Sequence, residues 1–274
     1  MRAAKTTTID LRFGFGPMKT TRQPWRLVLF LAVLAGGLAF AFSRRRFGQD
    51  PSYHLFADDR TYAGVPNFWN VVTNLPFLLV GLFGLARLGR LRRPALRSGL
   101  LIFASGVALV AFGSAYYHLA PSNATLVWDR LPMTIGFMAL FSLVVRDRLS
   151  ESLGRHALAP LLVIGASSVL YWYATELQGA GDLRFYFVIQ FLPMLLIPLL
   201  LLSGRGGGGL LGAWLWATLA LYLLAKQAES HDRDLLVASG LLSGHSLKHL
   251  IAACAVLCAL LAALRPVRSE PRDA

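Results

Sequence analysis

Charged residues are scarce in this chain: Asp, Glu, Lys and Arg together make up only 15% of its 274 positions. Soluble domains carry about 25% charged residues, so this scarcity excludes an ordinary soluble protein. Acidic residues are the rarer kind, with 14 against 27 Lys and Arg, and the net charge is +13. Such an excess can indicate nucleic-acid binding. Here the basic residues cluster between hydrophobic runs, as in cytoplasmic loops of membrane proteins, and we expect no nucleic-acid partner.

Cysteine is nearly absent, with Cys254 and Cys258 as the only two. They lie four residues apart within one apolar run, where successive helical turns give poor geometry for a disulfide. We therefore expect no bond between them and interpret both as small buried hydrophobic residues. They give no indication of the redox compartment.

Long hydrophobic runs are abundant, and 55% of the residues are hydrophobic. A helix needs about 20 apolar residues to cross the hydrocarbon core, and backbone that faces lipid must be helical or part of a closed barrel. The runs lack the period-two alternation of strands, so we predict an all-α polytopic membrane protein. The expected helices span 25–42, 68–87, 98–117, 124–145, 157–176, 185–203, 210–226 and 238–264, with a tight turn at Gly206 to Gly209.

These spans divide the chain into an N-terminal tail with a first transmembrane helix (1–48), a seven-helix membrane domain (49–264) and a basic C-terminal tail (265–274). The first span also resembles a signal peptide, because basic residues precede its apolar run and Ala39-Phe40-Ala41 resembles a cleavage site. Three arginines follow directly, at 44 to 46, and they favour a retained helix.

The distribution of Lys and Arg predicts the orientation. If the N-terminus lies inside, the inside segments hold seventeen of these residues and the outside segments six, as the positive-inside tendency requires. We therefore predict eight helices with both termini in the cytoplasm. The arginines at 44 to 46, on the outside, are the exception. Compact loops and arginine-rich tails are typical of a bacterial inner membrane.

Ionisable side chains at membrane depth are costly, which makes them functional candidates. Ser114 and His118 end the third span, four residues apart and hence on one helix face. Asp129 begins the fourth span. His245 and His249 lie early in the last span, at the spacing by which one helix presents two imidazoles to a metal. In the predicted topology all of these residues fall in the outer half of the membrane.

Three imidazoles with one open coordination position are typical of a catalytic zinc site. We predict that His118, His245 and His249 bind zinc, which lowers the pKa of a bound water to about 7. Asp129 could then orient the water or act as a general base. Ser114 could donate a hydrogen bond to the oxyanion that forms when hydroxide attacks a carbonyl.

Each of these residues also has an ordinary interpretation. His118 could be an interfacial residue, and the later histidine pair could cap, pack or serve a proton path. Ser114 could simply let two helices approach, and Asp129 could form a local ion pair with Arg130 near the interface. Only the combination is specific. We give Lys226, Glu229 and Lys248 no catalytic role, and expect Lys226 to pair with an acidic neighbour and Lys248 to point to another helix or the interface.

At these residues the chain resembles the alkaline ceramidase family, part of the CREST superfamily of membrane hydrolases that also holds the adiponectin-type receptors. The resemblance covers roughly residues 50 to 265. The matching segments are Asn67-Phe68-Trp69-Asn70-Val71-Val72-Thr73-Asn74-Leu75, Gly113 to His118, Asp129 to Met133 and His245 to His249.

The resemblance implies a seven-helix core with zinc held by His118, His245 and His249, and it assigns the family's serine and aspartate to Ser114 and Asp129. The implied reaction is hydrolysis of the N-acyl amide of a ceramide, which releases a fatty acid and a sphingoid base. Many bacteria lack sphingolipids, so we expect a ceramide-like lipid that reaches the site from the bilayer, and no obligate protein partner.

The chain departs from the family pattern at the calcium site of the eukaryotic members, which place a glutamate directly before Phe-Trp-Asn. Asn67 stands there in this chain, and the acidic residues nearby are Asp50, Asp58 and Asp59. This departure argues against calcium as a second cofactor.

Two other classes of function use the same residues. A lipid receptor or sensor would hold zinc as a structural ion without turnover, and the sequence separates it poorly from a hydrolase. A carrier would use the histidines for transport, but carriers often show repeated halves with broken helices, and no such symmetry is visible. A structural zinc site is usually closed by a fourth protein ligand, so the unused Asp129 and Ser114 favour hydrolysis.

Overall fold

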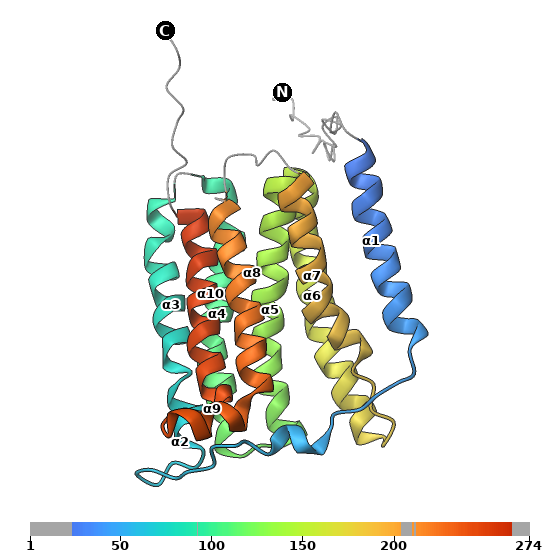
Figure 1. Cartoon of the computed structure of the whole chain (residues 1–274). Coiled ribbons are helices and arrows are strands. Elements are labelled where there is room, and N and C mark those ends of the chain that lie inside the picture. Colours follow the sequence, from blue (N-terminus) through green and yellow to red (C-terminus); the bar gives the residue numbers. More distant parts are fainter. Residues whose placement is uncertain (1–23, 92, 204–209, 211, 265–274) are drawn as a thin grey trace, which may run out of the picture.

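Each long apolar run forms a helix, and the helices stand side by side in an antiparallel bundle (Figure 1). The computed structural model describes residues 24–91, 93–203, 210 and 212–264. The tails expected at 1–23 and 265–274 and the turn at 206–209 lie outside this part. The helices are α1 (Pro24–Ser43), α2 (Phe68–Val72), α3 (Leu75–Arg87), α4 (Arg97–Leu119), α5 (Asn123–Arg148), α6 (Glu151–Leu177), α7 (Arg184–Ser203), α8 (Gly212–Ser230), α9 (Asp232–Ser239) and α10 (Gly244–Leu264).

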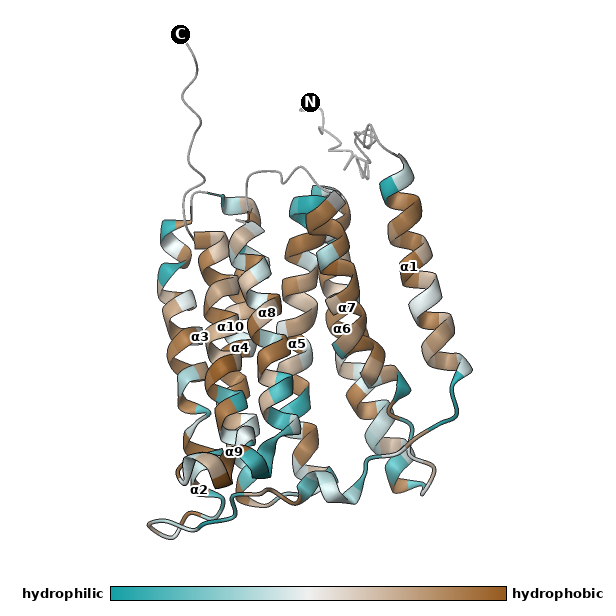
Figure 2. Ribbon diagram, in the orientation of Figure 1, coloured by the Kyte–Doolittle hydropathy of each residue, from teal (hydrophilic) through white to brown (hydrophobic). Residues whose placement is uncertain are grey.

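The all-α membrane architecture is confirmed. Seven helical stretches in the described part of the chain are long and apolar enough to cross a membrane. The remaining long helix, α8, packs along α10 in the same bundle (Figure 1), but Lys226 and Glu229 lower the hydropathy of its last turns. Figure 2 shows that hydrophobic residues dominate the helices, while hydrophilic ones gather toward the lower end around α9 and the start of α5. The chain is therefore built as an integral membrane protein.

The expected helix 68–87 is interrupted after Val72, which separates the short α2 from α3. The Thr73 hydroxyl donates to the Trp69 carbonyl at 2.6 Å, and the Asn74 amide donates to the carbonyl of the residue four positions before it at 2.7 Å. Side chains that bond to the backbone in this way compete with regular helix. Pro76, which follows, has no N–H to donate. The polar residues at this break are thereby turned toward the bundle interior.

The expected helix 238–264 is also divided. Gly240 adopts the left-handed conformation, with φ of 65°, and ends α9, as glycine commonly does at a helix C-terminus. The chain turns and begins α10 at Gly244. The interpretation of both cysteines as buried is wrong, because Cys254 of α10 is exposed and Cys258 is only half-buried, both as free thiols.

Two glycines allow the polar clusters on neighbouring helices to meet. Gly113 of α4 packs against the backbone carbonyl of Trp128 in α5, and Gly244 of α10 packs against that of Ala228 in α8. A Cβ atom at either position would overlap these backbone atoms. Small residues commonly let membrane helices approach closely. Here they bring α4 to α5 and α10 to α8 at the level of the candidate catalytic residues.

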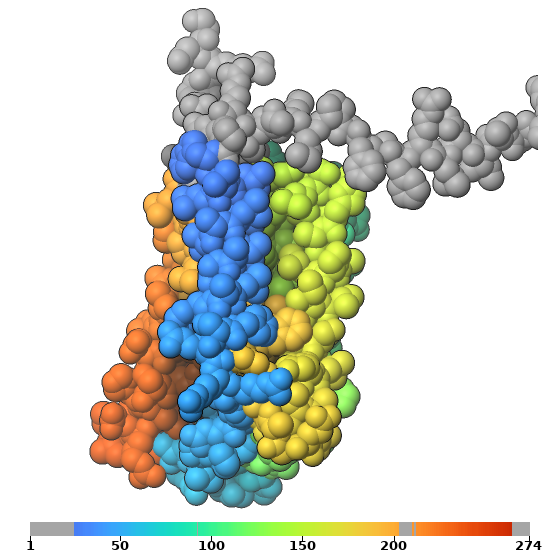
Figure 3. All heavy atoms as spheres, turned by 90° about the vertical axis from the view of Figure 1, so that its right-hand side faces the viewer, coloured from blue at the N-terminus to red at the C-terminus, as the bar shows by residue number. Residues whose placement is uncertain are grey.

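The first helix, α1, lies at the periphery of the bundle and packs against α7. Figure 3 shows α1 laid along this face, with the chain that follows it running down toward the lower end. Arg184 of α7 donates to the Arg44 carbonyl at 2.8 Å, and Arg46 lies 3.7 Å from the Asp182 carboxylate. Hydrogen bonds from Arg184 hold the pKa of Asp182 at about 2. The segment of arginines at 44 to 46 is thus tied to Asp182 and Arg184 at the start of α7.

Candidate active site

The three histidines predicted as zinc ligands lie together near the lower end of the bundle. His118 ends α4, and His245 and His249 stand one turn apart on α10. Their ring centroids are 4.9 to 5.0 Å from one another. One ligand atom from each ring lies within 4.8 Å of the others, and all three side chains are buried. This His triad could hold a metal ion.

The hydrogen bonds around the His triad leave suitable nitrogen atoms for a metal. Because the single proton of the Thr73 hydroxyl goes to the Trp69 carbonyl, the 2.9 Å contact between Thr73 Oγ1 and His249 Nδ1 requires a proton on Nδ1. Nε2 of His249 is then the unprotonated nitrogen that can bind a metal. Nδ1 of His118 is buried and has no hydrogen-bond partner within the described residues, which is costly for a polar atom. The donor set fits zinc.

This role of Thr73 leads to a prediction. Replacing Thr73 with Val removes the hydroxyl that orients His249, and we expect zinc affinity to fall roughly 10- to 100-fold, as is usual for such supporting groups. Thr73→Ser keeps a hydroxyl and should retain most of the affinity. Competition with a chromophoric chelator measures both variants. Equal zinc affinity in Thr73→Val and the unaltered protein would contradict the role.

The segment 67–75, which carries part of the resemblance, packs directly behind the His triad. The Asn67 side chain donates to the His118 carbonyl at 2.8 Å. The Asn70 amide donates to the Asp58 carbonyl at 3.1 Å and accepts from the Ser246 hydroxyl at 2.7 Å. These asparagines therefore fix the ends of α4 and α10. The sequence showed them as polar residues in an apolar run, but gave them no partner.

The chain before α2 covers the His triad from the lower side. The Phe56 ring centroid lies 4.7 Å from those of both His118 and His245. The Asp232 carboxylate accepts hydrogen bonds from the backbone N–H of Ala57 at 2.9 Å and of His245 at 2.7 Å. It thus joins this covering segment to the start of α10. Sequence reasoning gave neither Phe56 nor Asp232 a function.

The covering segment, residues 44–67, makes further contacts across the end of the bundle. His54 lies 2.9 Å from the Tyr117 hydroxyl and 3.0 Å from the Asn123 side chain. His54 is therefore half-buried and not an ordinary surface residue, although it lies between the helices that the sequence predicts. Arg60 pairs with Asp58 and donates to the Leu241 carbonyl at 2.6 Å. The segment is fastened to both sides of the site.

Ser114 and Asp129 lie beside each other on α4 and α5, and the Ser114 hydroxyl hydrogen-bonds to the Asp129 carboxylate. Both residues are buried and line the same cavity as the His triad. The alternative of an ion pair between Asp129 and Arg130 is wrong. The Arg130 guanidinium instead lies 4.2 and 4.5 Å from the ring centroids of Trp172 and Tyr186. Asp129 is left facing the cavity with Ser114.

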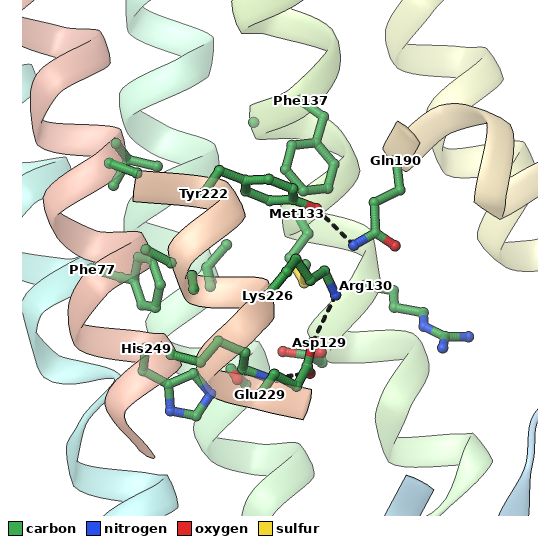
Figure 4. Close-up of a pocket in the computed structure, with 18 of the residues that line it drawn as sticks. Phe77, Asp129, Arg130, Met133, Phe137, Gln190, Tyr222, Lys226, Glu229 and His249 are labelled. Carbon is green, nitrogen blue, oxygen red and sulfur yellow. Dashed lines mark hydrogen bonds and ion pairs between the residues drawn. The ribbon is translucent and has the colours of Figure 1, made fainter. Parts of the chain in front are cut away.

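Lys226, Glu229 and Lys248 form a partly buried charge cluster beside the His triad, and Figure 4 shows Lys226 and Glu229 in the cavity near His249. Glu229 accepts from Lys226 at 2.8 Å and from Lys248 at 2.7 Å. The expected pairing of Lys226 with an acidic neighbour is confirmed. Lys248 does point to another helix, α8, but its Nζ also lies 3.0 Å from Nε2 of His245. Two ammonium groups share one carboxylate, so the cluster carries an excess positive charge.

A cavity of about 380 Å³ extends from the His triad into the bundle. Its polar end holds the His triad, Ser114 and Asp129, and its walls are largely apolar side chains of α4, α5, α7, α8 and α10. Figure 4 shows Asp129, Glu229 and His249 at the lower end, with Phe137, Tyr222 and Gln190 higher up. The volume lies within the range of small-molecule sites. The cavity thus combines apolar walls with a polar end at the His triad.

A family model described as Ceramidase matches residues 61–203, just over half of the chain. The chain belongs to the ceramidase family. In this ceramidase-family chain the matched region contains Ser114, His118 and Asp129, but ends before α8 and α10. His245 and His249 are therefore placed at the site by the geometry of the His triad. No curated protein and no solved structure matches the chain.

Proposed function

We propose that this protein is an integral-membrane, zinc-dependent hydrolase that cleaves the N-acyl amide bond of a ceramide-like lipid. The observation that carries the proposal is the buried His triad at the polar end of an apolar cavity, next to the hydrogen-bonded pair Ser114 and Asp129. Membership in the ceramidase family supports a hydrolase that acts on amide bonds of lipids. The apolar walls suit a substrate that reaches the site from the bilayer.

His118, His245 and His249 would hold the zinc ion. When bound, zinc supplies a Lewis acid that polarises a carbonyl group and lowers the pKa of water to about 7. The side chains around the His triad bind the substrate and exclude water. The walls of the cavity hold the acyl chain, and Phe56 keeps bulk water away from two of the three rings. Excluding water strengthens the electrostatic interactions inside the site.

Asp129 acts as the general base in this proposal. It takes a proton from the attacking water and returns it to the amine as the amide C–N bond breaks, so that water and amide yield a carboxylic acid and an amine. The Ser114 hydroxyl has one proton, which serves Asp129 in the resting arrangement. Once Asp129 is protonated, its O–H can donate to Ser114 Oγ. The Ser114 proton is then free to stabilise the oxyanion.

Metal analysis of the purified protein combined with hydrolysis assays tests this function. We expect about one zinc per chain, as for a three-histidine site, and release of free fatty acid from at least one lipid in a broad N-acyl panel. The panel contains ceramides, N-acylethanolamines and N-acyl amino acids. A zinc-loaded protein that cleaves none of them would instead favour a lipid receptor or sensor.

We also propose that both termini lie in the cytoplasm of a bacterial cell and that the His triad lies toward the outer half of the inner membrane. The end of α3 and the start of α4, which flank the loop 88–97, lie at the upper end of the bundle, and α9 lies at the lower end (Figure 1). A cysteine placed in loop 88–97 should be shielded from an impermeant thiol reagent in whole cells, while one placed in α9 should react. Both positions are tested in a background without Cys254 and Cys258. The opposite pattern would overturn the orientation.

A further inference from the structure

The cavity beside the His triad contains more cationic than anionic side chains. Its lining includes three cations, Arg130, Lys226 and Lys248, and two carboxylates, Asp129 and Glu229. Both lysines form ion pairs with Glu229, and the Asp129 carboxylate accepts a hydrogen bond from Ser114. Among the described residues Arg130 therefore has no carboxylate within ion-pair distance. Buried charges are normally paired because an isolated one is strongly disfavoured.

Arg130 is held firmly in place. Only 6% of the residue is exposed, and its guanidinium is packed against the rings of Trp172 and Tyr186. Nη2 donates to the Gln49 side-chain oxygen at 2.6 Å. Nη1 is buried and finds no hydrogen-bond acceptor in the described part of the chain. A rigid guanidinium with an unused N–H group is a ready binding point for a planar or tetrahedral anion.

The position of Arg130 relates this binding point to the proposed reaction. It follows Asp129 directly on α5, and both line the same cavity. The Arg130 guanidinium also lies 5.8 Å from the ring centroid of Tyr53, a residue of the segment that covers the lower end of the bundle. A group bound at Arg130 would therefore lie close to the residue that we propose as the general base. This location suits the amine half of an amide substrate whose acyl chain lies along the apolar walls of the cavity.

We infer that the cavity accepts N-acyl lipids whose amine half carries an anionic group, a carboxylate or a phosphate, and that Arg130 binds this group. The inference rests on the proposed amide hydrolase function, and narrows its substrate class. A neutral ceramide leaves the guanidinium unpaired in the cavity, whereas an anionic headgroup supplies the missing negative charge. Arg130 is a specificity-determining residue in this view, and Lys226 contributes further positive potential.

Equilibrium binding to metal-free protein in nanodiscs tests the inference, since no metal can then hold the anion. Two substrate pairs separate the possible sources of charge. N-oleoylglycine is compared with N-oleoylethanolamine for the carboxylate, and ceramide 1-phosphate with ceramide for the phosphate. We expect the anionic member of at least one pair to bind roughly 10- to 100-fold more tightly, the range for a hydrogen bond to a charged group. Equal or tighter binding of the neutral member in both pairs would overturn the inference.

Three variants identify the residue responsible. Arg130→Gln should remove the preference, and Arg130→Lys should retain part of it because the charge remains. Gln49→Glu is nearly isosteric and places a carboxylate against Arg130, so it should remove the preference without altering the packed guanidinium. Arg155→Gln removes an exposed arginine of α6 at the other end of the bundle and should keep the full preference. A preference that persists in Gln49→Glu would contradict the role of Arg130, even if Arg130→Gln does not fold.

The same substrates with zinc-loaded protein separate this inference from the proposed function. If anionic lipids bind preferentially but none is cleaved, the inference stands and hydrolysis fails. If both members of each pair are cleaved with equal kcat/KM and bind equally, hydrolysis stands and the inference fails.

Discussion

Replacing His245 and His249 together with alanine is expected to reduce bound zinc from about one ion per chain to none, because a single remaining imidazole is far from the usual set of three or four ligands. The two rings come from successive turns of α10 and face His118 of α4. Removing them takes away both α10 ligands at once. Elemental analysis of the purified variant measures the zinc, and hydrolysis of any N-acyl lipid should disappear with it.

The matched control is the double variant His156→Ala His231→Ala. Both of these histidines are exposed and lie outside the cavity, so zinc content and turnover should not change. Thermal unfolding with and without a chelator adds a second measurement. A metal that binds only the folded state stabilises it, and the chelator should lower the Tm of the control but not of the site variant. Full zinc content in the site variant would place the metal elsewhere.

Asp129→Asn is expected to retain zinc and lower turnover by roughly 100-fold or more, within the range for general acid–base groups. The amide oxygen of asparagine can still accept the hydrogen bond from Ser114, so the local packing is kept. It cannot take up the proton of the attacking water. The measurement is kcat on the best lipid of the panel, with zinc content determined on the same sample.

The control for Asp129→Asn is Asp234→Asn, which removes an exposed carboxylate of α9 and should leave kcat unchanged. Turnover of Asp129→Asn equal to that of the unaltered protein would remove Asp129 from the mechanism. Loss of zinc together with loss of turnover would assign it a role in holding the metal instead.

The long helices could be predicted from sequence because their lengths follow from the hydrophobic runs. The two interruptions could not, although both lie at the functional end. At Thr73 and Asn74, hydrogen bonds from the side chains to the backbone compete with the helix, and only the fold shows that they prevail. Gly240 ends α9 inside what reads as one apolar stretch. The hydrogen bonds and backbone conformation of single residues therefore determine where these helices are interrupted, and hydrophobic composition alone does not show it.

The sequence predicts those parts of the candidate site whose residues lie a few positions apart on one helix. His245 and His249 share a helix face whatever else the chain does, and His118 joined them through the expected depth in the membrane. Contacts between distant segments were not predictable. Thr73 reaches His249 across 176 positions of sequence, and Gln49 reaches Arg130 across 81. For Arg130, adjacency in sequence offered only the alternative of an ion pair with Asp129, whereas the aromatic rings against which it packs come from α6 and α7.

The covering segment has a kinetic consequence. It is fastened at His54, Ala57 and Arg60 across the end of the bundle that carries the His triad, so a molecule coming from the water would have to break several of these bonds. A molecule already dissolved among the acyl chains meets only helix faces. For the proposed hydrolase, the quantity that sets the rate is then the mole fraction of substrate within the two-dimensional bilayer. We expect that diluting the membrane with inert lipid slows the reaction even when the amount of substrate per millilitre is unchanged.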